Sequence, residues 1–137
     1  MVNKQENLEL AKDIFLKGEE KLKSAELLLK HELYDDCVSR IYYAVYFFTK
    51  SLLFLLGEES RTYKGMISIF GLKVIKMGLI DKKFGSILSN LHEKRERGDY
   101  SIYSFLDLAT TQKLFQDAII FKKEIRKILK DKFNLSI

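Results

Sequence analysis

Three observations predict an all-α fold, an up-and-down antiparallel bundle of four to five helices. Five segments repeat apolar residues at spacings of three and four, the period of an amphipathic helix. Proline, which interrupts helices, is absent from the 137 residues. No segment alternates apolar and polar residues as a half-buried strand does, and the connections between the five segments are short. We expect residues 1–137 to form one domain.

The first two expected helices are long. One runs from about Leu8 to Leu33 and carries a single apolar stripe. The other runs from about Asp35 to Leu56, where Asp35 or Asp36 can accept hydrogen bonds from the first-turn amides and Gly57 can end the helix. The second helix is apolar on nearly every face, so we expect it to lie at the centre of the bundle.

Three further helices follow, running from about Thr62 to Met77, from about Lys82 to Arg97, and from Asp107 or Thr110 to about Phe133. Gly78 and Gly98 are expected to end the first two of them. Lysines gather toward the end of the last helix, where cations interact favourably with the negative end of the helix dipole.

Composition narrows the classes of function. The formal net charge of +5 and the pI near 9.2 permit an anionic partner without requiring one. The single cysteine, Cys37, excludes an internal disulfide and a cysteine zinc site, and its helical, apolar setting predicts a buried side chain. The longest apolar run is interrupted by Thr49, Lys50 and Ser51, so no membrane span is expected, and no secretory signal is visible. We expect a cytoplasmic protein.

No pattern for a metal or a cofactor stands out. The two histidines, His31 and His92, fall on different expected helices, and there is no HExxH motif or carboxylate cluster. The two glycines and the single lysine in residues 57–65, GEESRTYKG, lack the phosphate-loop spacing and follow no strand. We therefore expect no metal and no cofactor.

An aromatic run, IYYAVYFF, occupies residues 41–48 of the second expected helix. Its tyrosines and phenylalanines cover all sides of the helix. A base-stacking surface needs exposed rings, and this helix is too apolar to be exposed. We therefore expect the rings to pack in the core, with the tyrosine hydroxyls reaching buried polar partners.

The stretch HEKRERGDYSIYS, residues 92–104, combines basic, acidic and aromatic side chains near a helix end. Arg95 and Asp99 are four residues apart and would share one helix face, where they can pair. Arg97 would point elsewhere, toward solvent or a phosphate, and Tyr100 and Tyr103 follow. The pattern fits an anion site. The spacing alone favours the other reading, an arginine–aspartate clamp that fixes the turn before the last helix.

Four motifs resemble the HEPN family of small prokaryotic helical-bundle proteins. Residues 39–47, SRIYYAVYF, resemble the Arg-x-Tyr-Tyr-Ala motif of its core helix, and RERGDY at residues 95–100 resembles its Arg-x-x-x-Asp-Tyr motif. RTYKGMISIFG at residues 61–71 resembles its small-polar-His-x-Gly turn, with Tyr63 where the histidine often stands. The last helix, TTQKLFQDAIIFKKEI, is also similar, and the order and spacing of the four motifs cover nearly the whole chain.

The resemblance implies a bundle of four or five helices that is usually dimeric. Many HEPN proteins are metal-independent ribonucleases or toxins, and they often work beside a minimal nucleotidyltransferase that acts as the antitoxin. Their catalytic signature is an arginine followed after about four to six residues by a histidine. In that pair the histidine moves a proton during attack by the RNA 2′-hydroxyl, and the arginine stabilises the phosphate charge.

This sequence departs from that signature. After Arg95 the positions for the histidine hold Tyr100, Ser101 and Ile102, and after Arg97 they hold residues 102–104. His92 precedes both arginines, so it cannot complete the motif in sequence. Tyrosine, whose pKa is near 10, is a poor general base at neutral pH. The resemblance thus leaves Arg95 as a phosphate ligand whose expected histidine partner is missing.

Three functions follow, in order of preference. The first is a non-catalytic or weakly catalytic module that binds a nucleotide, an RNA end or a partner nucleotidyltransferase, as a homodimer. Its binding residues would be Arg95, Arg97, Asp99, Tyr100, Lys64 and Lys94. The second is a ribonuclease toxin with Arg95, Tyr100 and His92 as its catalytic candidates. The third is a structural interaction protein, for which we expect Arg95 to be buried and paired with Asp99. The first two functions instead predict that Arg95 lines an open, basic cleft.

Overall fold

The chain folds into five α-helices and one π-helical turn. The computed structural model describes residues 3–100, 102 and 106–137, apart from the side chains of Asp99 and Tyr100. In chain order the elements are α1 (Lys4–Lys30), α2 (Tyr34–Leu55), α3 (Tyr63–Phe70), the π-helical turn η1 (Gly71–Ile75), α4 (Lys83–Tyr100) and α5 (Leu108–Phe133). The described part of the chain contains no strand, and the all-α prediction is confirmed.

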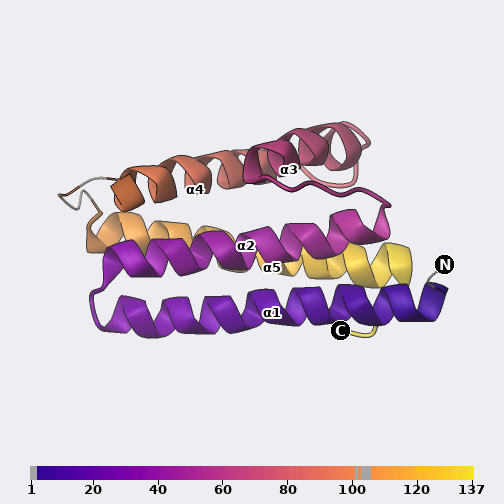
Figure 1. Cartoon of the computed structure of the whole chain (residues 1–137), viewed down its shortest axis with the longest axis horizontal. Helices are drawn as coiled ribbons and strands as arrows, with labels where there is room; N and C mark the ends of the chain where they lie inside the picture. The colour runs from indigo at the N-terminus through magenta and orange to yellow at the C-terminus, as the bar shows by residue number, and fades with distance from the viewer. Residues whose placement is uncertain (1–2, 101, 103–105) are drawn as a thin grey trace.

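Successive long helices run in opposite directions. Figure 1 shows α1 and α2 as antiparallel neighbours, α5 behind α2, and α3 with α4 along the other side of α2. Helix α2 contacts all four of the other α-helices, as its nearly continuous apolar sequence predicts. Of the described helices, none is long and apolar enough to cross a bilayer.

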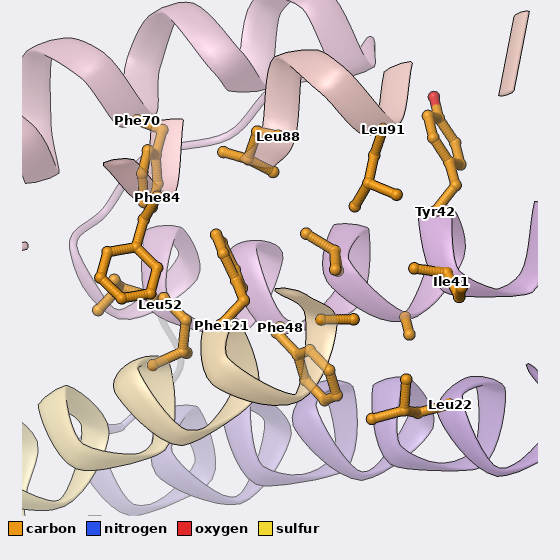
Figure 2. Close-up of a cluster of buried hydrophobic side chains, with 14 of the residues drawn as sticks. Leu22, Ile41, Tyr42, Phe48, Leu52, Phe70, Phe84, Leu88, Leu91 and Phe121 are labelled. Atoms are coloured by element: carbon orange, nitrogen blue, oxygen red, sulfur yellow. The ribbon is translucent and has the colours of Figure 1, made fainter. Parts of the chain in front are cut away.

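The core lies where the five α-helices meet. Its largest fully buried side chains include Phe15, Phe48, Phe70 and Phe121, and Figure 2 shows three of these phenylalanines packed with leucines of the neighbouring helices. The Phe15 and Phe48 ring centroids lie 4.9 Å apart across the contact between α1 and α2. Cys37 is fully buried and donates through Sγ to the Ala25 carbonyl oxygen at 3.2 Å, so the expectation for this thiol is confirmed.

Two expected helix ends are confirmed, and one expected N-cap is wrong. Gly57 and Gly78 adopt positive φ angles of 78° and 80°, which only glycine accepts easily. Helix α2 has Leu33 as its N-cap without a side-chain hydrogen bond, so Asp35 and Asp36 lie inside the first turn instead of capping it. There their negative charge faces the positive end of the helix dipole.

The third and fourth helices also differ from the prediction. The third is interrupted after Phe70 by the π-helical turn η1. The fourth continues through Gly98 to Tyr100, so the expectation that Gly98 ends this helix is wrong. The fifth helix has Asp107 as its N-cap, and the Asp107 carboxylate accepts a hydrogen bond from the Thr110 backbone N–H at 2.8 Å. Of the two expected starts, Asp107 and Thr110, the first is confirmed.

Candidate functional site

Arg95 lies among aromatic side chains from three helices. Its guanidinium carbon is 4.5 Å from the Tyr42 ring centroid and 5.2 Å from the Tyr43 ring centroid. Its Nη2 donates a hydrogen bond to the Tyr43 hydroxyl at 3.1 Å. Both tyrosines belong to α2, so the pair of rings fixes a half-buried guanidinium that projects from α4.

A stack of three rings extends this arrangement toward α3. The Tyr42 and Tyr63 rings are 4.2 Å apart between centroids and inclined by 21°. The Tyr63 and His92 rings are 5.3 Å apart and inclined by only 10°. We call these five residues, Tyr42, Tyr43, Tyr63, His92 and Arg95, the Arg95 cluster. It joins the first half of α2, the first turn of α3 and the second half of α4.

A tight turn places Tyr63 in the stack. Thr62 is the N-cap of α3, and its hydroxyl accepts from the Gly65 backbone N–H at 3.0 Å. A Cβ at Gly65 would collide with the side chains of Ser60 and Thr62, so this turn requires glycine. The small-polar–aromatic–x–Gly sequence therefore orients the Tyr63 ring toward His92.

His92 and Arg95 are brought together although their order along the chain is reversed. They are three residues apart on α4 and so share one face, and both lie beside the Tyr42 ring, with the His92 centroid 6.3 Å from it. Both imidazole nitrogens are buried and lack a hydrogen bond to any residue that the structure describes. Nε2 lies 3.3 Å from a Glu96 carboxylate oxygen, within ion-pair distance when the ring is protonated but without hydrogen-bond geometry.

Burial determines the protonation of the two inner tyrosines. Burial raises the pKa of Tyr42, and the nearby Arg95 guanidinium partly opposes that rise. Burial raises the pKa of Tyr63 well above its usual value, and Tyr42 adds to the rise. Both phenols are therefore protonated at neutral pH, so neither is suited to remove a proton from a substrate.

The other residues predicted for the site are scattered around the Arg95 cluster. Lys64 follows Tyr63 and is exposed, and Lys94 is half-buried beside Arg95. Arg97 is exposed and lies 3.8 Å from the Glu93 carboxylate on its own helix. The side chains of Asp99 and Tyr100 lie outside the described residues, as does Tyr103, so the expected Arg95–Asp99 pair stays a prediction.

Sequence reasoning missed the three tyrosines of the Arg95 cluster. The expectation that the aromatic run is wholly buried is wrong, because 37% of Tyr43 is exposed and the side chains of Tyr46 and Phe47 are half-buried. Tyr42 and Phe48 do lie in the core. A usable signal was present in the motif RIYYAVYF, where Tyr42 and Tyr43 are adjacent and must therefore point in directions about 100° apart.

Surface hollows lie elsewhere. A groove of about 840 Å³ runs between α1 and α5, and another of about 500 Å³ lies at the C-terminal half of α2. Neither is lined by Arg95 or His92. Across the described part of the chain, no group of three or more histidine, cysteine or acidic side chains is placed to hold a metal ion. At the Arg95 cluster the structure shows a fixed cation beside aromatic rings.

One family model and several known proteins match this chain over most of its length. The model of the HEPN domain matches residues 11–132. A protein of Methanocaldococcus jannaschii named "Putative toxin MJ0605" is 30% identical over 114 residues, covering 83% of this chain and 84% of the relative. A Thermotoga maritima protein named "UPF0332 protein" is 29% identical over 115 residues, covering 84% and 87%. A second M. jannaschii protein, named "Putative toxin MJ0142", is 27% identical over 113 residues, covering 82% and 77%. The chain belongs to the HEPN domain family.

Proposed function

We propose that this HEPN protein binds the phosphate of a nucleotide or of RNA at the Arg95 cluster, without cleaving it. The observation that carries the proposal is the position of Arg95. Its guanidinium is held against two tyrosine rings, stays half-buried, and keeps the permanent charge that phosphate recognition requires. The exposed ring of Tyr43 beside it offers a flat surface for a base.

Nearby cations strengthen the attraction for an anion. Lys94 and Arg97 lie within two residues of Arg95 on α4, and exposed Lys64 follows Tyr63 on α3. Glu93 and Glu96 lie on the same stretch of α4 and offset part of this charge. We therefore expect moderate affinity that weakens with salt, as binding to phosphates does.

The protonation of the cluster supports binding over cleavage. Metal-independent cleavage of RNA needs a group that accepts the 2′-hydroxyl proton. The raised pKa values of Tyr42 and Tyr63 keep both phenols protonated, and the two nitrogens of His92 are buried within the stack. Within the five residues of the Arg95 cluster, a bound RNA would therefore meet a fixed cation and no accessible base.

The names of two relatives contain the word toxin, which supports a place for this chain in a toxin–antitoxin-like system. In such a system the partner would be a minimal nucleotidyltransferase, and the chain would act as a homodimer. Co-purification with a nucleotidyltransferase encoded beside its gene tests the partner. Light scattering on the purified chain, with a mass near 32 kDa expected for two copies of 16.1 kDa, tests the dimer.

The binding proposal is tested by titrating labelled RNA and labelled ATP against the wild type and Arg95→Ala. We expect the variant to bind at least roughly tenfold more weakly, the size of one lost charge-assisted contact. Lys127→Ala is the matched control, because it removes one exposed positive charge from α5 and should change affinity little. Equal binding by wild type and Arg95→Ala would contradict the proposal, and equal binding with a less stable variant would favour a structural role for Arg95.

One observation favours a second candidate, a metal-independent ribonuclease. His92 and Arg95 both lie beside the Tyr42 ring, so folding brings a histidine to the arginine despite their reversed order. The His92 imidazole would have to leave the ring stack to reach a 2′-hydroxyl. RNA cleavage by the wild type in EDTA, lost in both His92→Ala and Arg95→Ala, would establish this function in place of simple binding.

A further inference from the structure

The outward face of α2 carries cationic and aromatic side chains in one stripe. Arg40, Tyr43, Phe47 and Lys50 follow one another at spacings of three, four and three residues, so they lie along one side of the helix. Arg40, Tyr43 and Lys50 are exposed, and Phe47 is half-buried. In Figure 1 this helix runs in front of α5, between α1 and the pair α3 and α4. We call these four residues the α2 stripe.

Cations from three helices lie over the rings of this region. Lys17 of α1 places Nζ 5.2 Å from the Phe47 ring centroid. Lys50 places Nζ 5.8 Å from the neighbouring Tyr46 ring, which itself packs edge-on against Phe47 at 5.0 Å. Arg95 of α4 occupies the corresponding position 5.2 Å from Tyr43. Each of these three rings, of which Tyr43 is exposed and Tyr46 and Phe47 are half-buried, thus has a positive charge beside it.

Accessible rings alternating with cations are the arrangement that binds single-stranded nucleic acid, where bases stack on rings and cations follow the backbone. Tyr43 and Phe47 are four residues apart, which is about 6 Å along a helix. The stripe from Arg40 to Lys50 is about 15 Å long by the same rise. That length suits a few nucleotides of single strand, whereas a duplex hides the base faces that the rings would contact.

Acidic residues lie close to the Lys50 end of the α2 stripe. The groove beside the C-terminal half of α2 is lined by Lys50 and Tyr46 but also by Glu58 and Glu59. These carboxylates would repel a phosphate backbone. A bound strand would therefore run from Lys50 toward Arg95 rather than across this groove.

We propose that the α2 stripe binds single-stranded RNA and extends the Arg95 cluster into a track for several nucleotides. This inference rests on the proposed function, because it takes Arg95 as the phosphate ligand at one end of the track. It adds the residues that recognise the single strand, Phe47 and Lys50, and it predicts that affinity grows with strand length.

The test compares three labelled probes by fluorescence anisotropy: the dinucleotide UpU, single-stranded U12, and a 12-base-pair RNA duplex. Phe47→Leu keeps an apolar side chain in the half-buried position but removes the flat ring. We expect it to weaken U12 binding about tenfold, the size of one lost base–ring stack, and to leave UpU binding unchanged. Lys50→Ala should weaken U12 binding and lower its salt dependence by about one phosphate contact.

Phe133→Leu is the matched control, because Phe133 is also half-buried and has Lys132 Nζ 5.9 Å from its ring, but it lies at the end of α5. It should bind U12 like the wild type. Loss of UpU and U12 binding in Arg95→Ala, with no change in Phe47→Leu and Lys50→Ala, would overturn the track and leave the proposed function standing. Binding of neither UpU nor U12 by the wild type would overturn both.

Two further outcomes also decide against the track. Duplex binding as tight as U12 binding would show that base stacking is not involved. A dimer that Phe47→Leu converts to a monomer, without effect on U12 affinity, would show that a second copy of the chain covers the stripe.

Discussion

Arg95 of α4 donates a hydrogen bond to the hydroxyl of Tyr43 on α2, although the two residues are 52 positions apart in the chain. The same guanidinium also lies over the Tyr43 ring at 5.2 Å from its centroid. Tyr43 is exposed at 37%, so its outer part is open to a ligand while its hydroxyl restrains the arginine. One tyrosine can therefore both position the phosphate ligand and contact a base.

Tyr43→Phe tests the positioning part of this role. The variant keeps the ring but removes the acceptor for Arg95 Nη2. Because this bond is near the surface, we expect unfolding free energy to fall by no more than about 1 kcal/mol. RNA affinity should fall roughly threefold to tenfold as Arg95 loses its fixed orientation. Urea unfolding and anisotropy titration measure the two effects, and unchanged RNA affinity would show that the hydroxyl does not position Arg95 for binding.

Gly18→Ala tests the close approach of α1 and α2. A Cβ at Gly18 would lie 2.6 Å from Phe48 Cε1, and Phe48 is fully buried, so its ring cannot move away freely. We expect the free energy of unfolding to fall by about 1–3 kcal/mol, the usual cost of overpacking a core. Gly71→Ala is the matched control, since a Cβ there meets nothing within 4 Å and its φ of −60° suits alanine. Equal stability of the two variants would contradict the packing at Gly18.

The pH dependence of stability tests the burial of Cys37. Burial raises the pKa of its thiol from 9.0 to about 11. The unfolded chain therefore releases the thiol proton at a lower pH than the folded chain does. The thiol's contribution is fully present below pH 9 and is lost as the pH rises toward about 11. Relative to Cys37→Ala, the wild type should lose roughly 2–3 kcal/mol of unfolding free energy over that window.

Urea unfolding of the wild type and Cys37→Ala at pH 8, 9, 10 and 11 measures this difference, while Tyr42 and Tyr63 contribute alike to both chains. A thiol reagent at pH 8 should label the wild type only after unfolding. Parallel pH profiles for the two chains, or rapid labelling of the folded wild type, would contradict the buried thiol.

The fold was predictable because helical periodicity is a local property. The repeats of three and four in each segment, with no proline, specify five helices and leave few alternatives to a bundle. The break after Phe70 was not predictable in the same way, because the residues of η1 continue an apolar helical pattern. Asp35 and Asp36 are residue types that often cap helices, but the N-cap of α2 is Leu33, so both aspartates lie inside the first turn.

The candidate site was predictable only in part. Arg95 could be singled out from its motif, since its residue type and position carry the signal. The adjacent pair Tyr42 and Tyr43 indicates that one of the two rings points away from the core, but the sequence does not say which one, because α2 is apolar on nearly every side. The association of His92 with Tyr63 depends on how α3 packs on α4, a contact between residues 29 positions apart. Such contacts between helices produce no periodic pattern in the sequence from which they could be predicted.

His92→Phe separates a structural histidine from a catalytic one. The imidazole lies nearly parallel to the Tyr63 ring, and both of its nitrogens are buried without a hydrogen bond to any described residue. Burying unsatisfied polar atoms is costly, and phenylalanine preserves the flat ring without them. We expect the variant to be as stable as the wild type or up to about 1 kcal/mol more stable. His92→Ala should instead be less stable, because it removes the ring from the stack.

The same two variants, His92→Phe and His92→Ala, test whether the ring stack contributes to RNA binding. If His92 serves only to support Tyr63 and Tyr42 behind Arg95, then His92→Phe should bind U12 with the wild-type affinity, and His92→Ala should bind it more weakly. Urea unfolding and anisotropy titration on both variants give the comparison. A His92→Phe protein that is stable and binds RNA, yet has lost an RNA cleavage that the wild type performs in EDTA, would show that the imidazole leaves the stack and acts on the substrate. That result would replace the binding function proposed for the Arg95 cluster with catalysis.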